Sequence, residues 1–373
     1  MDPWVGGTLV FAGLFRRWIS ANKHYNLIEA RYIVMTESYH VGPITKSRRA
    51  VIVATGSSLP DKVLDNADLE KMVDTSDEWI TTRTGIKQRR VITDGESTAT
   101  LALQAARNAL DMAQLSGQDV ELIICATITP EMVFPATACF IQDGIGNRSC
   151  CAFDLSAACS GFTYGIGMAS SAIESGLFNN ALVLGAETLS TITDYQDRAS
   201  CILFGDGAGA VLLQAETDTD RGILYSSLHA DGAGWETLSC RAYGSRHPVG
   251  KNLENPDDIY MNIRGRETYQ LAVRRIVELI SNATSHCGVS VDDVALFIPH
   301  QMNARIIESV VKRLKIPLEK MFVNIDRYGN TSAASIAIAL DEALRQGCAK
   351  KGDLIILVAF GAGLTWAVNL IRL

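Results

Sequence analysis

The sequence lacks the cysteine and histidine spacings that mark a metal site or a disulfide framework. Its nine cysteines in 373 residues follow no regular spacing, and it contains no C-x-x-C, H-x-x-x-H or H-E-x-x-H motif. Those patterns accompany bound metals, and regular cysteine sets accompany secreted disulfide scaffolds. The composition therefore predicts a reduced cytoplasmic protein without a bound metal.

The sequence also lacks a signal for membrane insertion and an excess of positive charge. The apolar run at residues 6–15 is too short to cross a bilayer, and basic residues follow it instead of preceding it as in a signal peptide. A formal net charge of -7 argues against a general nucleic-acid binder. We expect no membrane or nucleic-acid partner, and any acidic partner must be held by a local basic patch.

The chain is long enough for two units, and its pattern of helices and strands occurs twice. Each half has a helix, an unbroken apolar strand, a further helix and strand, a tight loop and a helix of small residues. Such an alternation predicts α/β layers with sheets covered on both faces. We expect an extension without stable order at residues 1–46, a first half at 47–217 and a second half at 218–373. The predicted elements include helices at 97–112 and 265–286 and strands at 50–54, 120–126, 152–155, 294–298 and 322–325.

Two predicted helices, one in each half, carry small or apolar residues on almost every face. One follows Cys159 and the other follows Asn330. A helix of this kind is buried on all sides, so the two should pack together and bring their N-termini into one region. A thiol at the start of a helix is expected to have a lowered pKa, although most cysteines are simply buried core residues.

Glycine-rich segments close both halves, at residues 202–213 and around Gly361-Ala362-Gly363. Gly205, Gly207 and Gly209 lead into an apolar strand and not into the helix that a phosphate-binding loop requires. We interpret these glycines as tight reversals of the chain.

Two polar residues of the second half are candidate partners of the cysteine. His300 directly follows a predicted buried strand, and Asn330 precedes the second small-residue helix, where it could also be an ordinary N-cap. Together with Cys159 they form a candidate nucleophilic site. The same residue types in the same order occur in papain-type hydrolases. The local cysteine signature, a secretory start and disulfides are missing here, so that alternative is remote.

Four motifs together resemble the β-ketoacyl-acyl-carrier-protein synthase III family of the thiolase-like superfamily, over about residues 50–373. They are Thr75-Ser76-Asp77-Glu78-Trp79-Ile80 with Arg83-Thr84-Gly85-Ile86, Ala157-Ala158-Cys159-Ser160-Gly161-Phe162, His300-Gln301-Met302-Asn303, and Gly329-Asn330-Thr331-Ser332-Ala333-Ala334-Ser335. The resemblance implies a homodimer with an α-β-α-β-α thiolase-like fold. It implies a condensing enzyme that initiates fatty-acid synthesis and uses no cofactor.

The resemblance also implies a role for each central residue. Cys159 would attack a short acyl-CoA primer such as acetyl-CoA, and backbone N–H groups of Cys159 and Ala362 would form the oxyanion hole. His300 and Asn330 would hold the thioester oxygen of malonyl-acyl-carrier-protein during loss of carbon dioxide.

By the same resemblance, other residues would bind the substrates. The expected CoA-binding residues are Trp79, Arg83, Arg198 and Asn303, and the expected acyl-pocket residues are Phe134, Leu189 and Phe204. Phe134 would reach across the dimer interface into the partner's pocket. One face of a predicted helix carries Arg305, Lys312 and Arg313, which could form the basic patch that the acidic acyl carrier protein needs.

Four positions depart from the family pattern. Ala362 stands where a glycine is usual, Leu364 where phenylalanine is common, and Arg266 and Gln270 replace residues that usually help bind pantetheine and carrier protein. Two alternatives remain besides the hydrolase: a sister condensing enzyme of secondary metabolism with a different starter, and a non-catalytic acyl-CoA-binding relic. The intact Cys159, His300 and Asn330 argue against the relic.

Overall fold

The computed structural model describes residues 48–373 except 243, 250–252 and 254, and the side chains of residues 265–268 are also outside the description. The expected extension at residues 1–46 and the departure at Arg266 therefore lie outside the described part. Within that part, no helix combines the length and the apolar character needed to cross a bilayer.

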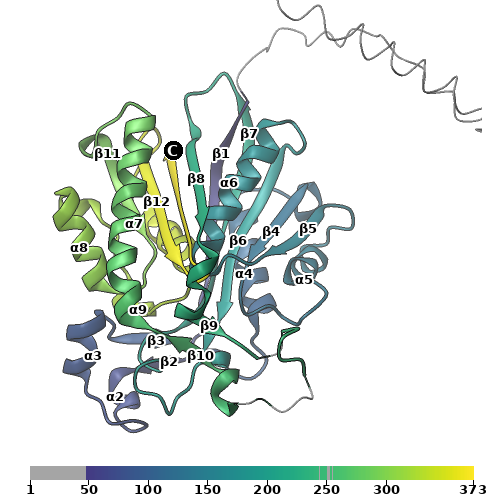
Figure 1. The fold of residues 1–373 in the computed structure, drawn as a ribbon. Helices are drawn as coiled ribbons and strands as arrows, with labels where there is room; N and C mark the ends of the chain where they lie inside the picture. The colour runs from purple at the N-terminus through teal and green to yellow at the C-terminus, as the bar shows by residue number, and fades with distance from the viewer. Residues whose placement is uncertain (1–47, 243, 250–252, 254) are drawn as a thin grey trace, which may run out of the picture. The chain divides into compact units, whose positions relative to one another are not determined.

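The first large sheet has five strands in the order β1-β7-β6-β4-β5 (Figure 1). Strand β4 is parallel to β5 and β6, whereas β7 runs antiparallel to both β6 and β1. The central strands are buried along their length, as expected for a sheet covered on both faces. The bounds are β1 Arg48–Ser58, β4 Leu122–Ala126, β5 Cys151–Leu155, β6 Asn180–Thr188 and β7 Asp206–Thr217.

The second large sheet has four strands in the order β11-β12-β13-β8, and only β11 and β12 are parallel. Two small sheets lie elsewhere in the described chain and pair β2 with β3 and β9 with β10. The bounds are β8 Gly222–Ala230, β11 Val294–Pro299, β12 Leu354–Gly361, β13 Thr365–Arg372, β2 Val63–Asp65, β3 Gln88–Arg90, β9 Leu238–Cys240 and β10 Met261–Ile263.

The helices form three layers around the two large sheets (Figure 1). Helices α4 (Thr98–Ala113) and α5 (Thr137–Gly144) pack on the outer face of the first sheet. Helices α7 (Gly265–His286) and α8 (Ala304–Leu314) cover the second sheet. Helices α6 (Gly161–Glu174) and α10 (Ala334–Arg345) share one core with strands of both sheets. The predicted α-β-α-β-α layering and the pair of buried central helices are confirmed.

Short helices and turns connect these layers. Helices α2 (Asn66–Leu69), α3 (Asp77–Thr84) and α9 (Ile325–Tyr328) lie below the sheets in Figure 1 or beside them. The 3-10 turns are η1 Gly117–Asp119, η2 Ala158–Ser160, η3 Leu189–Ile192, η4 Gly232–Thr237, η5 Pro256–Ile259, η6 Val291–Asp293 and η7 Leu318–Lys320.

Two local expectations were wrong. The segment at 322–325 is not a strand, because only Met321 forms an isolated bridge, to Phe297, before α9 begins. Residues 205–209 are not a reversal: Gly205 lies just before β7, and Gly207 and Gly209 lie within that strand. A Cβ on Gly209 would lie 2.5 Å from the Ala337 Cβ, so glycine is needed there for close packing of the strand against α10.

Candidate active site

Cys159 lies between β5 and α6, in the turn η2, and is 6% exposed. Helix α6 begins two residues later than the sequence pattern suggested, at Gly161. The residue before the cysteine, Ala158, has a φ of 46°, in the left-handed region that most residues avoid. This turn places the thiol at the wall of a cavity.

The thiol of Cys159 is surrounded by few polar groups. Burial raises its pKa to about 12, against the smaller lowering by the Ser332 hydroxyl and by the backbone N–H groups of Cys159 and Ala362. The expectation of a lowered pKa was therefore wrong for this state, because loss of hydration outweighs the helix end. The thiol needs a proton acceptor before it can act as a nucleophile.

The hairpin between β12 and β13 packs directly on the cysteine turn. The hydroxyl of Thr365 donates to the carbonyl of Ala157 at 2.9 Å and lies 3.0 Å from that of Ala362. A Cβ on Gly361 would lie 2.8 Å from the Cys159 nitrogen. Ala362 does not adopt a positive φ, so the substitution of the family's usual glycine introduces no backbone strain. Leu364, in the turn of this hairpin, is buried.

His300 follows β11 and is 1% exposed. Its Nδ1 lies 2.6 Å from the hydroxyl oxygen of Ser335, whereas its Nε2 is buried without a hydrogen-bond partner among the described residues. Burial lowers the pKa of His300 to about 3, so the imidazole is neutral near pH 7. A neutral ring with one unpaired nitrogen can offer that nitrogen to a ligand.

Asn330 lies in the loop before α10 and is not its N-cap, which is Ala333. Its Oδ1 accepts from the backbone N–H of Ser332 at 2.9 Å, and its Nδ2 donates to no other described residue. The segment from Asn330 to Ser335 therefore touches both other candidates: Ser332 affects the thiol, and Ser335 bonds to His300. Cys159 and Ser332 line the cavity described below, whereas His300 and Asn330 do not.

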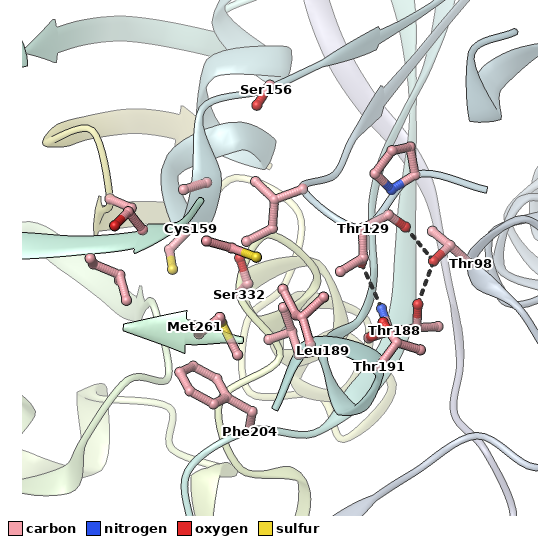
Figure 2. Close-up of a pocket in the computed structure, with 18 of the residues that line it drawn as sticks. Thr98, Thr129, Ser156, Cys159, Thr188, Leu189, Thr191, Phe204, Met261 and Ser332 are labelled. Carbon is pink, nitrogen blue, oxygen red and sulfur yellow. Dashed lines mark hydrogen bonds between the residues drawn. The ribbon is translucent and has the colours of Figure 1, made fainter. Parts of the chain in front are cut away.

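The cavity beside Cys159 has a volume of about 1000 Å³ (Figure 2). Figure 2 shows Leu189, Phe204 and Met261 grouped on one wall, with threonines farther along. Two of the three expected acyl-pocket residues, Leu189 and Phe204, line this cavity. Phe134 does not line it and is 81% exposed.

The expected CoA-binding residues form a cluster at the surface. The guanidinium carbons of Arg83 and Arg198 lie 4.6 and 4.7 Å from the centre of the Trp79 ring. Asn303 is the N-cap of α8 and accepts from the N–H of Arg305, while its Nδ2 donates to the carbonyl of Arg83 at 3.1 Å. The structure thus brings these four expected residues together.

The three expected basic residues are exposed on α8. Arg305 lies in its first turn, and Lys312 and Arg313 lie in its last turn. Among the described residues, none of the three forms an ion pair, which leaves their charges open to a partner. Gln270 is exposed on α7.

Sequence reasoning missed Glu187, which is fully buried at the end of β6. Its Oε2 accepts hydrogen bonds from the segment Thr127–Thr129. Its Oε1 has no partner among the described residues, and burial raises its pKa to about 7. A carboxylate after the apolar run of β6 was the available signal, since buried charges are rare without a role.

Two family models match the chain. The model described as 3-oxoacyl-[acyl-carrier-protein (ACP)] synthase III matches residues 153–232, and the model of its C-terminal region matches residues 284–373. The β-ketoacyl-[acyl-carrier-protein] synthase III of Caldanaerobacter subterraneus subsp. tengcongensis is 51% identical over 328 residues, which are 87% of this chain and 97% of that protein. The chain belongs to the β-ketoacyl-acyl-carrier-protein synthase III family.

Solved structures of the family agree with this assignment. The crystal structure of 3-oxoacyl-[acyl-carrier-protein] synthase III from Aquifex aeolicus VF5 is 48% identical, with a TM-score of 0.80 over 87% of this chain and 100% of that one. The priming β-ketosynthase of the R1128 polyketide pathway is 32% identical, with a TM-score of 0.80 over 88% of this chain and 97% of that one. The protein is thus a condensing acyltransferase with a thiolase-like fold.

Proposed function

We propose that this protein condenses a short acyl-CoA, such as acetyl-CoA, with malonyl-acyl-carrier-protein, releasing carbon dioxide and forming 3-oxoacyl-acyl-carrier-protein. One observation carries the proposal beyond family membership. The segment 330–335 carries Ser332, which lines the cavity together with the Cys159 thiol, and Ser335, which bonds to His300; His300 Nε2 and Asn330 Nδ2 donate to no described residue. A nucleophile and two free donors are what the two half-reactions require.

In the first half-reaction, the sulfur of Cys159 bonds to the acyl carbon and the bond to CoA sulfur breaks. The backbone N–H groups of Cys159 and Ala362 both interact with the thiol. We assign them to the oxyanion that forms on the acyl oxygen, where donors are most effective because the site is shielded from water.

In the second half-reaction, malonyl loses carbon dioxide and leaves an enolate that attacks the acyl-cysteine. The N–H of Gln301 approaches the Ser335 oxygen at 3.4 Å, which favours donation of the Ser335 proton to His300 Nδ1. That tautomer places the remaining imidazole proton on Nε2. His300 Nε2 and Asn330 Nδ2 would then both donate to the enolate oxygen.

For CoA we assign Trp79 and Arg198 to the adenine, Arg83 to the phosphates and Asn303 to pantetheine. Both guanidinium groups already lie against the Trp79 ring, so adenine would enter by displacing one of them. The acyl chain would lie against Leu189 and Phe204. The exposed Phe134 suits a role in the partner subunit's pocket of a homodimer, which keeps the primer short.

The carrier protein would dock on α8 through Arg305, Lys312 and Arg313, whose exposed positive charges complement an acidic partner. The proposed reaction needs no cofactor, and we place it in the cytoplasm. A sister role in secondary metabolism is less favoured, since identity to the polyketide enzyme is 32% against 51% for the β-ketoacyl-[acyl-carrier-protein] synthase III of Caldanaerobacter subterraneus subsp. tengcongensis.

Mass spectrometry of the intact protein after incubation with a mixture of acyl-CoAs tests the proposal. We expect one acyl group per chain, on Cys159 and on no other cysteine, with acetyl or propionyl dominant. The Cys159→Ala variant is the control and should remain unmodified. Absence of any acyl adduct on the wild-type protein would contradict the proposed function.

A further inference from the structure

Arg89, in the small β2–β3 sheet, is fully buried and has no part in the mechanism proposed above (Figure 1). Its Nη1 donates to the carbonyl of Leu64 at 3.1 Å and to Oδ1 of Asn66 at 2.9 Å, and its Nη2 donates to the carbonyl of Ile202 at 2.8 Å. All three acceptors are neutral oxygens. Among the described residues, no carboxylate forms an ion pair with this guanidinium.

An arginine in these surroundings is a poor source of stability. Burial lowers the pKa of Arg89 to about 10, so the group still carries its positive charge near pH 7. Its Nε is buried and has no hydrogen-bond partner within the described chain. Because a buried charge without a countercharge is costly to desolvate, its three hydrogen bonds indicate a role other than stabilising the fold.

The amide of Asn66 extends the contact to helix α3. Asn66 is 1% exposed, and its Nδ2 donates to Oδ1 of Asp77 and to the carbonyl of Ile86, both at 2.8 Å. Asp77 is the first residue of α3, and Ile86 lies just beyond its last turn. Asn66 thus holds both ends of the helix that contains Trp79 and Arg83.

The third acceptor, Ile202, belongs to a different part of the site. It lies in residues 198–203, which we call the Arg198 segment. The carbonyl of Leu203 in this segment accepts from the N–H of Asn330 at 2.9 Å, which fixes the segment to the loop before α10. Arg89 therefore joins α3, through its bond to Asn66, to a segment that is anchored at the candidate active site.

The two elements that Arg89 joins contain the two residues that we assign to adenine. Trp79 lies on α3, and the guanidinium carbon of Arg198 lies 4.7 Å from the centre of its ring. A base stacked between the two groups must contact both at about 3.5–4.0 Å. A shift of α3 by about 1 Å relative to the Arg198 segment would therefore weaken one of the two stacking contacts.

We propose that Arg89 and Asn66 together fix α3 against the Arg198 segment, and thereby set the slot that receives the adenine of an acyl-CoA. This inference rests on the proposed function, which assigns Trp79 and Arg198 to adenine. Both Arg89 and Asn66 are buried and neither lines the cavity beside Cys159, so they are positioning residues and not catalytic ones.

The test compares two acyl donors on the same protein. Acetyl-CoA is the complete donor, and acetyl-pantetheine has the same thioester and pantetheine arm without the adenine or the phosphates. The second-order rate constant for acylation of Cys159 is measured with each donor by mass spectrometry. A smaller folded fraction lowers both constants equally, so their ratio reports on the nucleotide site alone. The wild type should prefer acetyl-CoA.

Two variants interrupt the connection at different points. Arg89→Lys keeps the charge but loses the fork of donors that spans Asn66 and Ile202. It should lower the rate constant for acetyl-CoA about tenfold, as expected for one weakened stacking contact, and leave that for acetyl-pantetheine unchanged. Asn66→Asp keeps the acceptor for Arg89 but loses the N–H donor to Asp77, and should have the same effect. The double variant should lose no more than either single variant.

Arg48→Lys is the matched control. Arg48 also donates to two carbonyls and one asparagine, namely Ile173 at 2.6 Å, Phe178 at 2.7 Å and Oδ1 of Asn179 at 2.8 Å. These acceptors lie at or beyond the end of α6 that is farther from Cys159. The lysine variant at this position should keep the wild-type ratio of rate constants, whatever its effect on stability.

A wild-type ratio in Arg89→Lys would overturn the inference, as would a wild-type ratio in Asn66→Asp if the lysine variant fails to fold. An equal fall for both donors would also overturn it, because a purely structural role has that result. Equal rate constants for both donors in the wild type would show that there is no nucleotide site to position, and the inference would fail while the proposed condensation stands. If neither donor acylates Cys159 in the wild type, the proposed function fails instead.

Discussion

The loops that lead into the two central helices share a backbone conformation but carry different chemistry. In the Cys159 loop (residues 156–160), Ala158 has a φ of 46°, and in the Asn330 loop (residues 329–333), Ser332 has a φ of 47°. Both loops are followed within three residues by a buried helix, α6 or α10. The repeated conformation is the signature of the duplicated fold.

The two loops differ in the residues that neighbour the one with a positive φ. Cys159 follows Ala158 directly, whereas Asn330 lies two residues before Ser332, so the asparagine is not the counterpart of the cysteine. The first loop presents a nucleophile, and the second presents a hydroxyl and an amide. The duplicated frame therefore brings unlike groups together, and we assign acylation to the first loop and decarboxylation chiefly to the second.

The contact that holds the second loop against the first sheet should be sensitive to one methyl group. A Cβ on Gly185 in β6 would lie 2.2 Å from the carbonyl oxygen of Ala333. Gly185→Ala should lower the free energy of unfolding by about 3 kcal/mol, measured by denaturant titration. Gly232→Ala is the control, because a Cβ there meets nothing within 4 Å, and an equal loss in both would show that packing is not the cause.

The neutral state of His300 should make the folded protein sensitive to acid. Its pKa is lowered to about 3, below the unfolded value of about 6.5, so the unfolded chain gains a proton first and stability falls as pH falls below 6.5. Between about pH 7 and pH 5 this costs about 2 kcal/mol, which a His300→Asn variant should not lose. His286→Asn, at an exposed histidine, should retain the wild-type dependence. A loss in His300→Asn equal to that of the wild type would refute the neutral imidazole.

Charge reversal on α8 should impair the second half-reaction and not the first, since only the second uses carrier protein. Arg305→Glu with Lys312→Glu should raise KM for malonyl-acyl-carrier-protein about tenfold and leave acyl-CoA self-acylation unchanged. Lys350→Glu with Lys351→Glu, exposed but not on α8, should change neither. Equal damage to both half-reactions would rule out α8 as the docking surface.

The smallest effect concerns the primer. If Phe134 closes the partner's pocket, Phe134→Ala should favour longer acyl-CoAs by about 0.8 kcal/mol, or fourfold, per buried methylene. Competition between acetyl-CoA and octanoyl-CoA measures this preference. Met132→Ala, at an exposed neighbour that does not line the cavity, should not alter it. An unchanged preference in Phe134→Ala would place the end of the pocket elsewhere.

The sequence predicted the layers well because apolar periodicity and small-residue helices report burial directly. It predicted α7 with its bounds and identified the buried pair α6 and α10. It failed at 322–325, where an apolar run lacks a partner strand, and at Gly205 to Gly209, where glycine serves packing and not a turn. Whether a segment pairs as a strand, or needs glycine for close packing, depends on the residues that lie against it in the folded protein.

At the candidate site, residue identity was predictable but electrostatics was not. Family motifs indicated Cys159, His300 and Asn330, yet the expected low thiol pKa depends on burial that only the fold reveals. Glu187 was missed because its hydrogen-bond partners, Thr127 to Thr129, lie 58 to 60 positions away along the chain. Contacts over that range have no local sequence signal.

The most direct test measures the two half-reactions separately in three variants. Acyl transfer to Cys159 is followed by mass spectrometry, and carbon dioxide release from malonyl thioester is followed independently. Cys159→Ala should lose acyl transfer completely. His300→Ala and Asn330→Asp should retain acyl transfer in part but release carbon dioxide about 10²–10³-fold more slowly, since each loses one donor to the enolate.

Asn330→Asp is the sharper of these variants, because aspartate keeps the oxygen that accepts from the Ser332 N–H and replaces the free N–H donor by a carboxylate oxygen, which repels an enolate. The division of labour between the two loops predicts slow decarboxylation with acylation largely preserved in this protein. Abolished acylation with unchanged carbon dioxide release would contradict it.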